Sequence, residues 1–338
     1  MKIKFGIVGC GTIAPWHIRA IRAVEGAEVT AVMHPDAAVS CQWGETYGTD
    51  SFTDLETMLR QGDMDAISIC TPSGQHAQQA IAALQAGKHA VVEKPMAITA
   101  TSLEAMLEAE RQSEASIFPI CQLRLSPDIQ TAKELIAQGV LGKLVMADLS
   151  MKEYRSGEYY QEKKWRGTWA LDGGGALMNQ GIHGLDLLRY LCGDVKEFSC
   201  RAGALHHTIE TEDTLAASLV FENGCLGVMT ATTSVYPGYR RRMEICGTKG
   251  SMIFRESELI ELHTDSGLTL EAVKQPPQNG LCPQEPELIP HVLQYRDIVR
   301  AITTGVPPRL TSKDAAETVR HVLSLYRAAG IGQKGNDL

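Results

Sequence analysis

The chain has 338 residues, of which 44% are hydrophobic and 21% charged, and its formal net charge is −8. This length favours two domains, and the acidic balance excludes the basic footprint of a nucleic-acid-binding protein. Lys2 leads directly into an apolar strand-like run, and no apolar stretch approaches the roughly eighteen residues of a membrane span. The nine cysteines never form a CxxC pair. We therefore expect a cytoplasmic protein without membrane segment, disulfide framework or metal site.

Short apolar runs alternate with amphipathic patterns in the first part of the chain. We predict strands at 3–8, 28–33, 66–70, 89–92 and 117–122, and helices at 13–24, 55–60, 76–86 and 102–113. Nearly all-apolar strands separated by helices are typical of a parallel sheet that is covered on both faces. Residues 1–122 are therefore expected to form a doubly wound, Rossmann-type dinucleotide-binding domain.

Residues 123–338 follow a different rhythm and are expected to form an α+β domain. A helix at 129–138 precedes a strand at 144–151 and a loop rich in Tyr, Lys, Arg and Trp. Strand-like runs with turn signals then predict an open, mostly antiparallel meander at 198–204, 215–221, 225–233, 241–246, 251–254 and 259–263. Helices are predicted near 290–303 and 312–329, after a Pro/Gln-rich loop at 274–286. Packing of the terminal helix back on the first domain is left open.

Residues 9–14, GCGTIA, form a GxGxxA fingerprint directly after the first strand and at the start of a helix. The first glycine permits a tight turn, and the second lets the backbone approach a pyrophosphate. The small third residue lets helix and strand pack closely, so that the phosphates lie at the helix N-terminus. In this context the fingerprint predicts a bound dinucleotide. The expected contacts are Gly9, Gly11, Thr12, Ile13 and Ala14.

The second strand ends about twenty residues later, where an acidic residue would hold the adenosine ribose of NAD. His34 occupies this position, and Asp36 lies two residues beyond it. A nearby arginine would indicate NADP, but none occurs between Arg22 and Arg60. We expect NAD, with NADP as the alternative.

Two turns at the carboxyl ends of later strands, where ligands bind in parallel sheets, carry further candidates. Cofactor contacts are expected at Thr71, Pro72, Ser73, His76, Glu93 and Lys94. For Ser73, a helix cap is an equal interpretation. Pro95 makes the turn rigid, and a lysine held beside a cationic nicotinamide could exchange protons near neutral pH.

Residues 171–188, LDGGGALMNQGIHGLDLL, combine three glycines with a helical pattern. Spacings of four and three would place Asn179, His183 and Asp186 in one row along this helix. The glycines would let a ligand approach the backbone, which favours an active-site edge. The alternative is an amphipathic helix with a satisfied polar seam.

The loop before this helix is the expected specificity segment. Tyr154 and Trp165 could stack on the apolar face of a sugar ring, and Arg166 could bind a carboxylate or phosphate with two hydrogen bonds. Burial of the tryptophans Trp165 and Trp169 as loop anchors is the alternative.

The motifs occur in the order and spacing of one protein family. They are the fingerprint at 9–14, Thr71-Pro72-Ser73 with His76, Glu93-Lys94-Pro95, Gln122 with Arg124, and the helix at 173–186. Over essentially its whole length the chain resembles the glucose–fructose oxidoreductase / inositol dehydrogenase / rhizopine-catabolism (Gfo/Idh/MocA) family of NAD(P)-dependent oxidoreductases. The resemblance implies a Rossmann domain, a second domain with an open antiparallel sheet, and a homodimer or homotetramer in which these sheets pair.

The resemblance also implies roles for individual residues. Lys94 would contact substrate and relay protons, and His183 would act as general acid/base. Asn179 stands where inositol-type members commonly carry Asp, so it could orient a hydroxyl but not take its proton. Arg124, in the same motif set, is expected to contact substrate.

We therefore expect hydride transfer between a nicotinamide and a secondary alcohol or carbonyl of a sugar, polyol or sugar acid. Other enzymatic outcomes are reduction of a keto or imino group and dehydration with internal hydride return. The non-enzymatic alternative is a nicotinamide-dependent sensor. A sensor would be expected to lose Lys94 or His183, and both are present.

Overall fold

The computed structural model describes residues 2–273 and 286–332, so the predicted loop at 274–286 lies almost entirely outside the described residues. The chain divides into two compact units. The first comprises Met1–Gln122 and Asn279–Ala316, and the second comprises Leu123–Gln278 and Glu317–Leu338.

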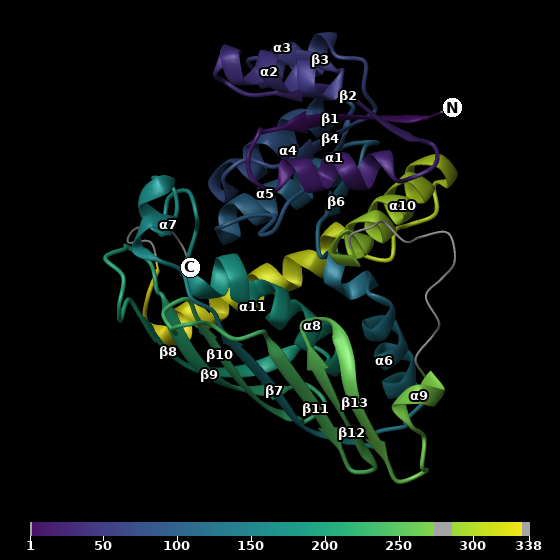
Figure 1. The fold of residues 1–338 in the computed structure, drawn as a ribbon, viewed down its shortest axis with the longest axis vertical. Coiled ribbons are helices and arrows are strands. Elements are labelled where there is room, and N and C mark those ends of the chain that lie inside the picture. Colours follow the sequence, from purple (N-terminus) through teal and green to yellow (C-terminus); the bar gives the residue numbers. More distant parts are fainter. Residues whose placement is uncertain (1, 274–285, 333–338) are drawn as a thin grey trace. The chain divides into compact units, whose positions relative to one another are not determined.

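The first unit contains a six-stranded parallel sheet in the order β3-β2-β1-β4-β5-β6 (Figure 1). The strands are β1 (Ile3–Val8), β2 (Ala27–Met33), β3 (Asp50–Phe52), β4 (Ala66–Ile69), β5 (His89–Val92) and β6 (Ile117–Pro119). The helices are α1 (Ala14–Arg22), α2 (Ala37–Tyr47), α3 (Leu55–Gln61), η1 (Ser73–Gln75), α4 (His76–Gln85), α5 (Ala100–Arg111), η4 (Pro286–Leu288) and α10 (Ile289–Thr304). The strand order reverses at β1 and β4, which is where such sheets bind ligands. The predicted Rossmann architecture is confirmed.

Two elements of this unit carry weak sequence signals and were not predicted. Helix α2 has no continuous apolar stripe and buries only Ser40 and Gly44, while the edge strand β3 has three residues. The domain boundary predicted from the sequence assigned helix α10 to the second domain. In the structure, this helix packs in the core of the first unit. Its Tyr295 is fully buried and meets Phe5 of β1 edge-on, with ring centroids 5.5 Å apart.

The second unit contains a seven-stranded mixed sheet in the order β13-β12-β11-β7-β10-β9-β8. The strands are β7 (Leu144–Lys152), β8 (Val195–Gly203), β9 (Thr214–Phe221), β10 (Leu226–Thr232), β11 (Arg242–Gly247), β12 (Gly250–Arg255) and β13 (Glu258–Thr264). The helices include η2 (Gln122–Leu125), α6 (Pro127–Ala137), α7 (Gly157–Glu162), η3 (Ala176–Gly181), α8 (Ile182–Cys192) and α9 (Leu270–Val273); α11 (Ser312–Ala329) begins in the first unit and ends in this one.

The open, mostly antiparallel sheet is confirmed, but a continuous meander is wrong. Strand β7 lies between β10 and β11 and pairs with β10 in parallel and with β11 in antiparallel orientation (Figure 1). Hydrophobic alternation reports which face of a strand is buried and not which strand is its neighbour, so the periodicity could not reveal this insertion.

Helix α8 packs closely on the buried face of β7. A Cβ on Gly184 would lie 2.5 Å from a methyl carbon of Leu149, so only glycine fits there without a shift. On the opposite face of the sheet, Leu226 and Val228 of β10 are exposed. In the part of the chain that the structure describes, no helix is long and apolar enough to cross a membrane.

Candidate active site

The turn from β1 to α1 has the backbone that a pyrophosphate requires. Gly9 has φ +97°, and a Cβ there would lie 3.0 Å from the Cys70 backbone, so only glycine fits. Gly11 is exposed, and Ala14 opens α1 with no side chain capping the helix. Pro15 has no amide hydrogen, and the amides of Ala14 and Trp16 donate to the carbonyls of Gly11 and Ile13 at 3.3 and 3.0 Å. The exposed turn before the helix is therefore the part whose backbone can approach a pyrophosphate. In this turn Thr12 is exposed and Ile13 half-buried.

Two residues lie at the end of β2, where the adenosine ribose of the cofactor is expected. The Asp36 carboxylate accepts hydrogen bonds from the amides of Ala38 and Val39, so it serves as the N-cap of α2. The amide of Asp36 donates to Nδ1 of His34 at 3.1 Å. His34 is half-buried where β2 ends.

Lys94 stands in a turn after β5 that a buried carboxylate holds. The Lys94–Pro95 peptide is cis. Glu93 is 6% exposed; its Oε2 accepts from the Lys94 amide at 3.0 Å, and its Oε1 lies 2.9 Å from Nε2 of His17. Glu93 therefore supports the backbone of Lys94 from beneath.

His17 continues this support into the core of the first unit. Its Nδ1 lies 2.6 Å from the Tyr295 hydroxyl and 2.8 Å from the Ser68 hydroxyl, and all three residues are fully buried. Burial alone would raise the pKa of Glu93, but the hydrogen bond and charge of His17 lower it to about 2. Burial lowers the pKa of His17, but its neighbours, Glu93 among them, raise it well above the usual range, so the pair is ionised and braces the turn.

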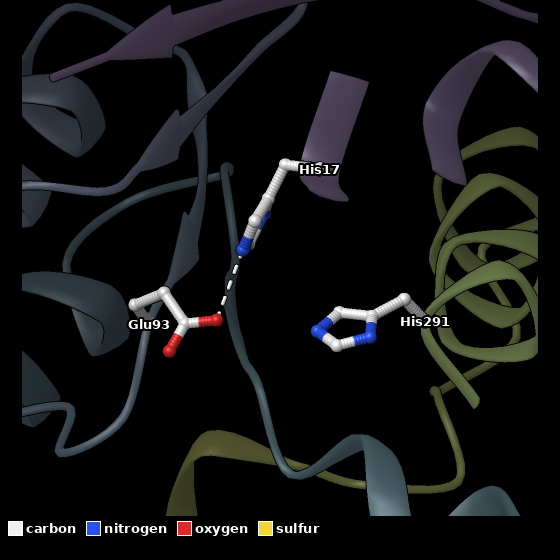
Figure 2. Close-up of side chains that lie close together, drawn as sticks. All are labelled: His17, Glu93 and His291. Atoms are coloured by element: carbon white, nitrogen blue, oxygen red, sulfur yellow. Dashed lines mark hydrogen bonds and ion pairs between the residues drawn. The ribbon is translucent and has the colours of Figure 1, made fainter. Parts of the chain in front are cut away.

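His17, Glu93 and His291 form the cluster whose ligand atoms could approach one metal ion, within 4.8 Å of one another (Figure 2). Among the described residues, His291 is 5% exposed and neither ring nitrogen has a hydrogen-bond partner. Burial and the nearby His17 lower the pKa of His291 to about 4, so it is neutral. His17 and Glu93 already direct their facing atoms at each other, which favours a structural support over a metal site.

His76 links the two predicted cofactor turns from inside the protein. It is 1% exposed, and its ring nitrogens lie 2.8 Å from the Pro95 carbonyl and 2.9 Å from the Thr71 carbonyl. Ser73 is also buried, whereas Thr71 and Pro72 are half-buried. His76 thus joins the two turns from inside the unit.

In the second unit, Asn179 and His183 lie on either side of a junction between two helix types. Asn179 lies in η3, a π-helical turn, and His183 is the second residue of α8. Both are half-buried. The Asn179 amide nitrogen donates to Asp172 at 2.8 Å, and the other Asp172 oxygen accepts from the Gly167 amide at 2.9 Å. The side chain that would orient a hydroxyl is thus itself held in place.

The expected polar row is wrong at Asp186. This residue is 3% exposed, its carboxylate binds Arg124 through two contacts of 2.7 Å, and it accepts from the Thr318 hydroxyl at 2.7 Å. Arg124, expected to contact substrate, is likewise 3% exposed. Helix α8 is buried on nearly every side beyond His183, with residues 184–189 all buried, so position 186 lies in the core of the unit.

Two of the glycines before η3 admit protein groups. A Cβ on Gly174 would lie 2.1 Å from the Tyr326 hydroxyl, and one on Gly175 would lie 1.7 Å from the Glu212 carbonyl oxygen. The sequence reasoning missed Glu212 and Tyr326. The glycines indicated that some group approaches the backbone closely. No local pattern could identify these groups, because Glu212 lies 37 residues from Gly175 and Tyr326 lies 148 residues from Met178.

In the expected specificity loop, the Arg166 side chain lies over the rings of Tyr159 and Trp165. The Arg166 guanidinium lies 3.9 Å from the centroid of the Tyr159 ring and 5.9 Å from that of Trp165. Arg166 also lines a surface pocket of about 440 Å³ with Gly167, Thr168 and Glu210 among others. Trp169 donates from its indole to the Glu210 carbonyl at 3.0 Å.

Tyr154 belongs to a separate aromatic pair. Its ring meets Tyr236 edge-on at 5.3 Å, and its backbone forms an isolated bridge with Ser234.

The sequence of each unit matches a family model. Residues 3–119 match the model described as oxidoreductase family, NAD-binding Rossmann fold, and residues 129–253 match the GFO/IDH/MocA C-terminal domain. The chain belongs to the Gfo/Idh/MocA family of oxidoreductases. The resemblance drawn from the motifs is thereby confirmed.

Relatives in this family include enzymes of sugar metabolism. The WlbA dehydrogenase of Bordetella pertussis, solved with NADH and UDP-GlcNAcA, superimposes with a TM-score of 0.89 at 30% identity over 98% of this chain and 96% of that chain. The 1,5-anhydro-D-fructose reductase of Ensifer adhaerens is 26% identical over 98% of this chain and 97% of its own. The D-apiose dehydrogenase of Paraburkholderia graminis is 24% identical over 98% and 89%, respectively.

Proposed function

We propose that this Gfo/Idh/MocA protein is a dehydrogenase that oxidises a secondary alcohol of a sugar, polyol or sugar acid with NAD. A bound nicotinamide would supply the hydride acceptor. Within the chain, a ring nitrogen of His183 takes the hydroxyl proton as the carbon–hydrogen bond breaks. Lys94 donates a hydrogen bond to the same oxygen and exchanges protons with it before His183 takes the single proton that is lost, and Asn179 orients a neighbouring hydroxyl.

The buried support behind Lys94 carries this proposal. An ionised carboxylate, Glu93, holds the Lys94 amide, and His76 lies within hydrogen-bonding distance of the Pro95 carbonyl. Precise orientation of a proton-transferring group is what general acid–base catalysis needs, whereas a binding-only sensor gains nothing from it. The Asp172 contact supports the same conclusion for Asn179.

The substrate class includes nucleotide-linked sugar acids. The WlbA relative was solved with UDP-GlcNAcA, and Arg166 lines a pocket where its guanidinium already pairs with the exposed Glu162 carboxylate at 3.2 Å. An arginine there suits a carboxylate or phosphate.

We also propose NAD in preference to NADP. No arginine stands between Arg22 and Arg60 to hold a ribose phosphate. Titration of each cofactor, followed by quenching of tryptophan fluorescence, checks this preference. Binding of NADP more than about tenfold tighter than NAD would contradict it.

The activity is tested by NADH absorbance at 340 nm against polyols, aldoses, aldonic and uronic acids, and UDP-linked sugar acids. We expect steady NADH formation with at least one of them, and a loss of at least about 100-fold in kcat for His183→Asn. Cofactor binding without turnover across this panel would favour a sensor. Full turnover by His183→Asn would show that another residue is the general base.

A further inference from the structure

The π-helical turn η3 begins with four consecutive backbone amides that need partners. They belong to Gly175, Ala176, Leu177 and Met178, and η3 has no capping side chain of its own. Helical starts leave such amides unsatisfied, and a buried unsatisfied amide is costly. All four residues are buried.

Glu212, just before β9, binds three of these amides. Its carboxylate accepts from Gly175 at 2.9 Å and from Leu177 at 2.8 Å, and its backbone carbonyl accepts from Ala176 at 2.9 Å. The Tyr326 hydroxyl of α11 accepts from the fourth amide, of Met178, at 3.2 Å and donates to the Glu212 carboxylate at 3.0 Å. Two distant side chains thus replace a local helix cap.

Among the described residues, few titratable groups act on this carboxylate. Glu212 is 1% exposed, and η3 carries no titratable side chain. The titratable groups that act on it or feel it are the Tyr326 hydroxyl from α11 and the Cys200 thiol from β8. The neighbouring Asp213 directs its carboxylate at other amides, those of residues 205–207.

We propose that Glu212 is a positioning residue: its carboxylate, together with Tyr326, caps η3 and thereby fixes the backbone that carries Asn179 and leads into His183. The kinetic part of this inference rests on the proposed function. A carboxylate is also favoured at a helix start, where the peptide dipoles present their positive end. π-Helical turns are frequent at functional sites. In η3, the first amides bind the distant side chains of Glu212 and Tyr326.

The cap depends on the charge of Glu212. The carboxylate accepts from two amides and the tyrosine hydroxyl, so a proton on Oε2 displaces the Gly175 amide, and a proton on Oε1 displaces the Leu177 amide or reverses the hydrogen bond with Tyr326. Burial raises the pKa of Glu212 to about 7 despite these hydrogen bonds. Protonation therefore falls in the pH range of ordinary assays, and turnover is expected to decline on its acidic side.

The test compares wild type, Glu212→Gln and Tyr326→Phe, with Asp213→Asn as the matched buried-carboxylate control. Amide hydrogen exchange is followed by mass spectrometry in peptides covering 173–183. We expect exchange there to be at least about tenfold faster in both cap variants at pH 8 and unchanged in the control. With an active substrate, kcat falls at least about tenfold in Glu212→Gln, and the acidic limb of the wild-type pH profile near 7 disappears.

Unchanged exchange in both cap variants would overturn the inference whatever the activity. If exchange rises but no substrate turns over in wild type, the cap stands and the proposed function fails. If exchange rises while kcat and the acidic limb remain as in wild type, Glu212 is a structural cap without a positioning role. Tyr326→Phe, which retains the carboxylate, decides the matter if Glu212→Gln does not fold.

Discussion

Lys94 is the residue on which the proposed chemistry depends most directly, because it stands in a turn braced by Glu93. We predict that Lys94→Ala lowers kcat at least about 100-fold, the usual size of a general acid–base contribution, while NAD binding remains measurable by fluorescence. Lys2→Ala, which removes an exposed lysine paired with Glu28 in the same unit, is the control and should change kcat less than about twofold. Equal activity of both variants would exclude Lys94 from proton transfer.

Glu212 makes the stability of the protein depend on pH. Its pKa is raised from 4.5 to about 7, so the folded state binds its proton more tightly than the unfolded state does. The resulting stabilisation is complete below about pH 4.5 and is lost as pH rises through 7. We predict that the free energy of unfolding of wild type, minus that of Glu212→Gln, falls by up to about 3 kcal/mol between pH 4.5 and 8, measured by urea unfolding. If the difference in free energy of unfolding between the two proteins stays constant with pH, the pKa of Glu212 is not raised.

At the level of elements, the glycines before η3 explain how the cap can form. A Cβ on Gly175 would lie 1.7 Å from a backbone oxygen, which cannot move without displacing Glu212. We predict that Gly175→Ala lowers the free energy of unfolding by about 3 kcal/mol. Gly203→Ala in β8, where the nearest atom would lie 3.7 Å away, is the control and should change it by less than about 1 kcal/mol. Equal effects of the two variants in thermal or urea unfolding would contradict the close approach.

The sequence predicted elements whose signal is local. The apolar runs of β1 and β5 and the fingerprint before Ala14 identified the Rossmann sheet and its ligand edge, and the bounds of α11 match those predicted. What it missed depends on distant partners. The π-helical winding of η3 is fixed by Glu212 and Tyr326, so a 3.6-residue pattern could not reveal it.

The same contrast, between local sequence signals and contacts with distant residues, holds for single side chains. His76 and Arg124 were expected at ligands because they lie in motifs, but both are buried and bound to protein groups. A sequence motif shows which residues belong together, whereas the burial of a side chain in the folded protein decides which groups it can contact. Lys94, Asn179 and His183, by contrast, are half-buried, so part of each residue is open to solvent.

At the scale of the whole molecule, the exposed sheet face of the second unit predicts self-association. Leu226 and Val228 are 54% and 41% exposed on this face, and family resemblance implies that such sheets pair. We predict a homodimer or homotetramer by light scattering, and a smaller assembly for Val228→Glu. Val306→Glu, at an exposed valine outside the sheet, should leave the mass unchanged. A monomeric wild type would contradict the pairing.

The central claim is that this chain moves a hydride from a sugar carbon to a nicotinamide. The most direct test uses the substrate found in the panel, deuterated at the carbon that is oxidised, with the cofactor product analysed by mass spectrometry. We predict one deuterium per NADH formed, and no labelled product above background with the Lys94→Ala, His183→Asn double variant. Unlabelled NADH from the wild-type protein, or undiminished transfer by the double variant, would contradict the account.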